Sequence, residues 1–140
     1  MSDFDWVTAR SKCSPDSALK MLGEQIEIDV AKRNELLSPT EMRYGIKFQY
    51  TPGAIALRVD CHQSLGGLSL IGSAVFSQTE DGIRVAYRPH RDEIIGVLTL
   101  DNDGKCCIRV REGYDPLNFW QFRKLALEAV FFEATKGLSL

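Results

Sequence analysis

The sequence has no long uninterrupted run of apolar residues. A membrane-spanning helix needs roughly 18 of them in succession, and Lys, Arg, Asp or Glu breaks every candidate stretch sooner. Near the N-terminus, Asp3 and Asp5 occupy a region that is basic in secretory signal peptides, and no apolar segment of signal-peptide length follows them. We therefore expect a cytoplasmic protein that is neither exported nor anchored in a membrane.

A strong net charge is also absent. Lys and Arg number 17 and Asp and Glu number 19, which gives a formal net charge of -2. A chain with so small a charge has no overall electrostatic attraction to nucleic acid or to an anionic membrane. The net charge therefore gives no reason to expect nucleic acid or a membrane as a partner.

Phosphate-binding and metal-binding motifs are missing as well. Gly66-Gly67 is not followed by the Lys-Ser/Thr pair of a P-loop, and no G-x-G-x-x-G occurs. Segment 101–105 resembles part of a calcium loop, but the alignment puts Thr99 and Val110 where Asp and Glu belong. A hairpin turn explains this segment better. We expect no cofactor and no metal.

Cysteine is scarce, and its spacing matches neither a zinc site nor a redox C-x-x-C motif. The four cysteines are Cys13, Cys61, Cys106 and Cys107. A reducing compartment disfavours disulfides, and free cysteine is among the most buried residue types. We expect buried thiols.

No catalytic constellation is apparent. Cys61-His62 is the only adjacent thiol and imidazole, and neighbours on a strand point to opposite faces, so the two side chains do not meet as nucleophile and base. The carboxylate pairs lie in predicted turns, where short acidic side chains mainly cap backbone groups. We name no catalytic residue.

The residues that are present describe an ordinary globular chain. Its 140 residues fit a single domain, 1–140, and 44% of them are apolar and 26% charged, close to the averages for such domains. The apolar periodicity divides the chain into a helical block at 14–44, a β-meander at 45–111 and a C-terminal helix at 115–136.

The helical block begins with a capping pattern. Ser14 followed by Pro15 is typical of a helix N-terminus, and apolar residues then recur at helical spacing. This predicts an amphipathic helix over about 16–37. Ser38 and Glu41 then form a capping-box pattern, which marks the passage into strands.

In the middle block the apolar period changes from 3.6 to 2. The predicted strands lie at about 46–50, 55–61, 67–78, 82–88, 93–101 and 105–111. Every connection is short, whereas a parallel pair needs a crossover of roughly a dozen residues. We predict an α+β fold in which an antiparallel five- to six-stranded meander packs against an N-terminal and a C-terminal helix.

Arginines within the strands form the main polar pattern. Alternation places them on the face opposite the apolar residues, where they are candidates for binding an anion or another ligand. These residues are Arg58, Arg84, Arg88, Arg109 and Arg111. The strand aromatics align with the core face instead, so the stacking groups of a nucleic-acid platform are missing and nucleic acid is an improbable partner.

The C-terminal helix is unusually apolar. Asp115-Pro116 predicts its start and Lys136-Gly137 its end. Its apolar arc is wider than one sheet face requires, which leaves two interpretations open: a deep monomer core, or an exposed strip that pairs with another chain. We favour the second, with a C2 homodimer. The candidate interface residues are Phe119, Trp120, Leu127 and Phe131.

The sequence leaves open whether residues 3–13 form a helix or a strand, but residues 6–13 alternate between apolar and polar side chains, which is typical of a strand. The element order then becomes β–α–β-meander–α, which resembles the helix-grip fold of START and Bet v 1-like proteins over the whole chain. The resemblance implies a curved sheet that wraps a long C-terminal helix around an apolar pocket. No residue motif accompanies it, and the single long first helix departs from the helix pair usual in that family.

These features predict a non-catalytic binding or interaction protein that acts as a homodimer, such as a small adaptor or chaperone-like domain. The alternative is a protein that binds a small apolar or anionic ligand in a cavity between sheet and helix. An enzyme that uses this cavity ranks last, because no nucleophile–base pair or metal cluster can be named.

Overall fold

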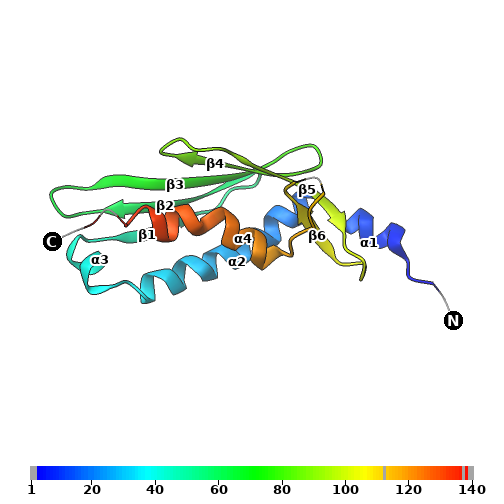
Figure 1. The fold of residues 1–140 in the computed structure, drawn as a ribbon, viewed down its shortest axis with the longest axis horizontal. Coiled ribbons are helices and arrows are strands. Elements are labelled where there is room, and N and C mark those ends of the chain that lie inside the picture. Colours follow the sequence, from blue (N-terminus) through cyan, green and yellow to red (C-terminus); the bar gives the residue numbers. More distant parts are fainter. Residues whose placement is uncertain (1–2, 112, 137, 139–140) are drawn as a thin grey trace.

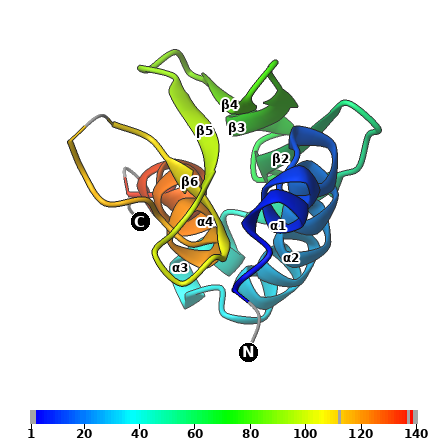
Figure 2. The same ribbon diagram turned by 90° about the vertical axis from the view of Figure 1, so that its right-hand side faces the viewer.

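The computed structural model describes residues 3–111, 113–136 and 138. One antiparallel sheet carries the helices α2 and α4 on the same face, and both run in the same direction along it (Figures 1 and 2). The elements are α1 (Trp6–Lys12), α2 (Pro15–Glu35), α3 (Pro39–Arg43), β1 (Lys47–Thr51), β2 (Ala56–Gln63), β3 (Ser69–Gln78), β4 (Gly82–Arg88), β5 (Ile94–Leu100), β6 (Cys106–Arg109), α4 (Phe119–Glu128) and the π-helical turn η1 (Ala129–Glu133).

The sheet is a simple meander. Each strand pairs antiparallel with the next one in the chain, so the spatial order is β1-β2-β3-β4-β5-β6. The predicted α+β class is therefore confirmed. Its cause is the shortness of the connections, which leave no room for a parallel crossover.

The capping patterns of the first block form as predicted. The Ser14 hydroxyl accepts a hydrogen bond from the Ser17 N–H, and Ser38 does the same for the N–H of Glu41. These bonds satisfy donors that a helix N-terminus otherwise leaves unpaired. The first cap starts α2, which buries apolar residues at helical spacing against the sheet, and the second starts the short helix α3.

The structure decides between the strand and the helix that the sequence left open for residues 6–13. This segment is the helix α1, whose N-terminus is capped by Asp5 through the N–H of Thr8. No residue of α1 is buried, so its apolar alternation does not report a packed sheet face. The helix-grip resemblance is not confirmed, because the chain enters the sheet through helices alone.

The C-terminal helix starts later than the Asp115-Pro116 pattern suggests. Asn118 is its N-cap and accepts a hydrogen bond from the N–H of Gln121. Leu117 instead forms an isolated bridge to Ile108 in β6, with a hydrogen bond in each direction. The helix therefore begins after Leu117, because that residue pairs with β6.

The expectation of four thiols is also wrong. Cys13, at the end of α1, forms a disulfide with Cys106 at the start of β6, whereas Cys61 and Cys107 are free and buried. The disulfide is a covalent anchor for α1, which has no buried residue of its own. Disulfides are typical of oxidising compartments, so the cysteines no longer support a cytoplasmic location.

Buried apolar side chains fill the space between the sheet and the helices. Leu22 and Ile26 of α2 belong to one buried cluster with Phe76 and Ile83 of the sheet, and Phe122 of α4 packs against Phe76 with ring centroids 6.4 Å apart. All five are inaccessible to solvent.

Other parts of the chain contact each sheet edge at one strand residue. At β1, the Asn34 side chain of α2 donates to the Phe48 carbonyl and accepts from the Phe48 N–H, at 2.8 and 2.9 Å, as a neighbouring strand would. The Ile46 N–H donates to the Glu41 carbonyl. At β6, Leu117 pairs with Ile108. These contacts satisfy backbone groups that an edge strand would otherwise leave unpaired.

We expect Asn34→Ala to lower the free energy of unfolding by about 2 kcal/mol, because it leaves two partly buried backbone groups of Phe48 without partners. The higher helix propensity of alanine offsets only about 0.5 kcal/mol of this loss. Urea denaturation followed by circular dichroism measures the change. Asn102→Ala, at an exposed turn residue, is the control and leaves stability unchanged. Equal stability of the two variants would contradict the role of Asn34.

Candidate binding groove between the helices

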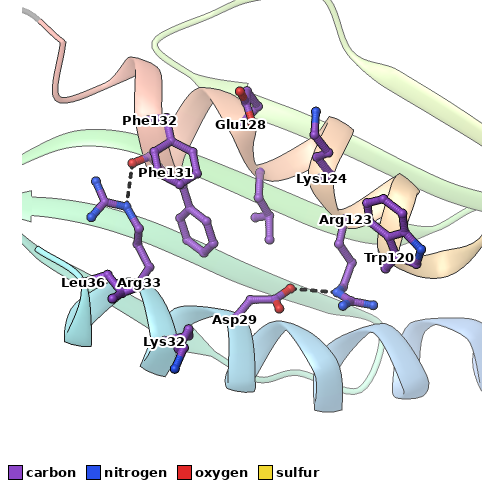
Figure 3. A pocket seen from close by; sticks show the side chains of 11 residues that line it. Asp29, Lys32, Arg33, Leu36, Trp120, Arg123, Lys124, Glu128, Phe131 and Phe132 are labelled. Atoms are coloured by element: carbon purple, nitrogen blue, oxygen red, sulfur yellow. Dashed lines mark hydrogen bonds and ion pairs between the residues drawn. The ribbon is translucent and has the colours of Figure 1, made fainter.

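A groove runs between α2 and the α4–η1 segment (Figure 3). It arises because two parallel helices on one sheet face leave a furrow along their line of contact. Its volume is about 300 Å³. We call it the α2–α4 groove, and its lining residues are Asp29, Lys32, Arg33, Leu36, Trp120, Arg123, Lys124, Leu127, Glu128, Phe131 and Phe132.

The groove combines a buried apolar floor with exposed apolar rims. Leu127 and Phe131 are only 2% and 7% exposed and belong to the core beneath. Trp120, Leu36 and Phe132 are 56%, 65% and 51% exposed, with Trp120 at one end and the other two at the opposite end (Figure 3). Large apolar side chains gathered around a depression are typical of a surface that binds another molecule.

An ion pair crosses the groove near its middle. Arg123 Nε of α4 donates to Asp29 Oδ2 of α2 at 2.7 Å (Figure 3). The two side chains are 15% and 29% exposed, so solvent screens this pair less than a surface ion pair. The bond joins residues far apart in the sequence and sets the spacing of the two helices.

A second cross-link lies at the far end of the groove. Arg33 of α2 donates through Nε to the Phe131 carbonyl at 2.9 Å, and its two terminal nitrogens bind the carboxylate of Glu41 in α3. The guanidinium also lies between the rings of Phe48 and Phe132, 4.7 and 4.8 Å from their centroids. Arg33 therefore connects α2, α3, β1 and η1.

This environment keeps Glu41 ionised. Burial by itself raises the pKa of Glu41, but hydrogen bonds from the Arg33 side chain and the Ser38 N–H outweigh burial and lower the pKa to about 2. A buried charge of this kind is stabilising only while its partner stays in place.

The π-helical turn η1 directs two adjacent phenylalanines to different places. Phe131 packs edge-on against Phe48 in the core, with ring centroids 5.2 Å apart, whereas Phe132 lies at the rim. Next to the turn, the hydroxyl of Tyr87 donates to the Ala126 carbonyl at 2.7 Å, and burial raises the pKa of Tyr87 to about 12. Turns of this type occur frequently at functional sites.

The structure separates the four candidate interface residues. Trp120 is exposed and Phe119 is half-buried. Leu127 and Phe131 are buried in this chain's own core, which corrects their assignment to an outer surface. The wide apolar arc of the helix is explained mostly by α2, which lies beside α4 and packs against it in addition to the sheet.

The candidate arginines do not converge on one site. Arg58 pairs with Asp60 of its own strand, with Nε and Oδ2 2.9 Å apart, and Arg84 pairs with Glu93, with Nε and Oε2 2.8 Å apart. Arg111 lies over the Tyr114 ring at 5.2 Å. The other two candidates are exposed and lie in β4 and β6, namely Arg88 and Arg109.

The thiol and imidazole of Cys61-His62 have different environments. Cys61 is buried in the core, and burial raises the pKa of its thiol to about 12. His62 lies beside the buried Asp60, with Nε2 and Oδ2 3.8 Å apart. Within the described chain, Asp60 Oδ1 and His62 Nδ1 have no hydrogen-bond partner. The low thiolate population of Cys61 does not suit a nucleophile.

Comparison with known proteins adds no relative, since no family model, no curated protein and no solved structure matches this chain. Among residues 3–111, 113–136 and 138, no group of three or more His, Cys, Asp or Glu side chains is placed to hold a metal ion. No helix in the same ranges is both long and apolar enough to cross a membrane. The interpretation of the groove therefore rests on its geometry.

We expect Glu41→Gln to lower the free energy of unfolding by about 3 kcal/mol at pH 7, because the folded-state pKa of Glu41 is about 2 instead of 4.5. A lowered pKa stabilises the fold above pH 4.5, and this contribution is lost as the pH falls toward 2. Urea denaturation of the wild type and of Glu41→Gln between pH 7 and pH 2 should therefore show that their difference in unfolding free energy shrinks as the pH falls.

Glu35→Gln is the matched control for this experiment. Glu35 is an exposed acid whose nearest cation, Lys32, lies 3.6 Å away, and such surface pairs contribute roughly 0–1 kcal/mol. A Glu41→Gln deficit that stayed constant between pH 7 and pH 2 would show that the charge of Glu41 is not its source.

Proposed function

We propose that this chain is a non-catalytic interaction protein that binds an apolar segment of a partner protein in the α2–α4 groove. The observation that carries the proposal is the exposure of Trp120, Leu36 and Phe132 around a floor of buried apolar side chains. Aromatic residues next to a well-packed depression are typical of residues that dominate binding energy at protein interfaces.

The frame of the groove supports this proposal. The Arg123–Asp29 and Arg33–Glu41 pairs join the two walls, so the groove exists before a ligand arrives. Such preorganisation lowers the entropy cost of binding. A volume of about 300 Å³ accommodates one or two large side chains and lies at the lower end of small-molecule sites.

The non-catalytic part of the proposal rests on the state of the reactive groups. Burial raises the pKa of both free thiols, Cys61 and Cys107, which keeps them protonated. Inside the groove, Arg123 is engaged with Asp29, and Arg33 with Glu41. Groups that already hold each other in ion pairs suit a structural frame better than general acid–base chemistry.

A peptide-binding experiment tests the groove. Trp6→Phe leaves Trp120 as the only tryptophan, a fluorescent reporter at the rim. The probe is an uncharged synthetic helix with leucines at i, i+3, i+4 and i+7 and glutamines elsewhere. We expect a saturable blue shift of the Trp120 emission, and we expect Leu36→Ala in the same background to weaken binding about fivefold.

Ile28→Ala is the matched control, because Ile28 is as exposed as Leu36 and lies on α2, whose C-cap is Leu36, but does not line the groove. It should leave the affinity unchanged. Absence of a saturable shift, or equal losses in the two variants, would refute binding in the groove.

We also propose that the chain forms a homodimer through the outer side of α4. Leu125, Ile95 and Tyr114 lie there around a second depression of about 870 Å³. This depression shares Trp120 and Lys124 with the α2–α4 groove, so the homodimer and the partner segment would compete for these two residues. Its rim carries both signs of charge, among them Lys124 and the acidic residues Glu93 and Asp115. A surface of mixed charge can complement its own copy, as a C2 interface requires.

Multi-angle light scattering over a concentration series tests the dimer. We expect Leu125→Asp to yield a folded monomer, because a carboxylate in the centre of an apolar interface is costly to bury. Leu68→Asp changes an equally apolar but separate loop residue, 79% exposed, and should stay dimeric. A wild-type chain that is monomeric at every concentration, or two variants with the same mass, would overturn this assembly.

A further inference from the structure

The turn between β2 and β3, residues 64–68, carries exposed leucines. Leu68 is 79% exposed, the highest value for a large apolar side chain among the described residues, and Leu65 is 53% exposed. Gly66 and Gly67 between them have positive φ angles, and at either glycine an added side chain would begin in open space. We call this turn the β2–β3 tip. It protrudes into solvent with nothing packed against its two glycines.

Hydrogen bonds hold the base of the tip against the junction of α3 and β1. The Ser64 N–H donates to the Gly45 carbonyl at 3.2 Å, and the Leu65 N–H donates to the Tyr44 carbonyl at 3.0 Å. Figure 1 shows this turn and α3 at the same end of the molecule, opposite α1. The tip therefore has a fixed position at this end.

The charges at this end leave an excess of positive ones. Residues 64–73 contain no charged side chain. Most acidic side chains of the segments that end here are paired with cations, and Asp92 is offset by Arg88 at the end of β4. The pairs are Arg33–Glu41, Lys32–Glu35, Arg58–Asp60, Arg84–Glu93 and Arg91–Glu133. Arg43 of α3 and Lys47 of β1 are exposed and form no ion pair with another described residue.

The turns at the opposite end of the sheet have the reverse character. Those after β3 and β5 contain Glu80, Asp81, Asp101 and Asp103 and a single cation, Lys105. The chain therefore has one positive end with exposed leucines, although its formal net charge is -2. An anionic surface would attract the molecule with the β2–β3 tip toward it.

The shape of the tip suits a lipid surface better than a protein partner. Protein interfaces are enriched in aromatic residues and need close shape complementarity, whereas the tip is a protruding turn whose large side chains are leucines. A bilayer surface needs no matching shape. Aliphatic side chains enter it at headgroup level, where the backbone of a turn stays hydrated, and nearby cations bind anionic headgroups.

From these observations we infer that the β2–β3 tip binds the surface of an anionic bilayer, with Leu65 and Leu68 inserted at headgroup level and Arg43 and Lys47 against the headgroups. The association is peripheral and reversible, because two leucines and two cations supply much less than a membrane-spanning helix. None of these residues lines the α2–α4 groove or the depression beside α4, so the inference is independent of the proposed function.

Sedimentation with vesicles tests the inference. The wild-type chain should bind vesicles of phosphatidylcholine mixed with phosphatidylserine, and bind phosphatidylcholine alone much more weakly, with the difference shrinking at high salt. Leu65→Ser with Leu68→Ser, and separately Arg43→Gln with Lys47→Gln, should each lower the affinity for the mixed vesicles about tenfold. All four side chains are exposed, so circular dichroism should show both variants folded.

Each variant has a matched control. Ile55→Ser changes an apolar side chain that is 75% exposed in the turn between β1 and β2, at the opposite end of the sheet. Lys20→Gln with Lys105→Gln removes two exposed cations elsewhere. Both controls should keep the affinity of the wild type.

Controls that bind as weakly as the tip variants would overturn the tip as the point of contact. Equal binding of the wild type to both kinds of vesicle would overturn the anionic lipid. A wild type that sediments with neither would refute the membrane contact, and tip variants of lower mass in light scattering would then identify the tip as a contact between copies of the chain.

Discussion

The buried guanidinium of Arg33 is the interaction on which the helical layer depends. It binds a carboxylate, a backbone carbonyl and two aromatic rings at once, so it connects segments at both ends of the chain. An ion pair of this kind contributes little net stability compared with an apolar cluster, but losing one partner leaves an uncompensated charge. Its effect is therefore to define where η1 lies against α2, and hence the shape of the groove.

The groove is a consequence of how the sheet is covered. The two helices lie side by side on one face, bury apolar side chains against the strands and leave the α2–α4 groove between them. In most proteins side chains fill such a groove. Here Trp120 and Phe132 stay at its rim because the Asp29–Arg123 pair and the π-helical turn hold the adjacent backbone in place.

Much of the fold could be predicted because it depends on local signals. Ser14 and Ser38 mark helix starts through hydrogen bonds within one turn, and period-two alternation with short turns permits only a meander. The sequence could not decide between strand and helix at residues 6–13, because alternation has meaning only where one face is buried, and no residue of α1 is buried. The disulfide was missed because spacing along the chain does not show that Cys13 and Cys106 meet.

The candidate site lay beyond such reasoning. Apolar periodicity marked the C-terminal helix as unusual, but it did not distinguish Leu127 from Trp120, since both are apolar. Only the position of α2 places Leu127 in the core and leaves Trp120 at the rim of the groove. Nothing in the sequence shows that Asp29 pairs with Arg123 or that Arg33 pairs with Glu41. Caps, periods and turn lengths act over a few residues and can be read along the chain. Ion pairs and grooves arise between helices that meet after folding, so they depend on three-dimensional packing.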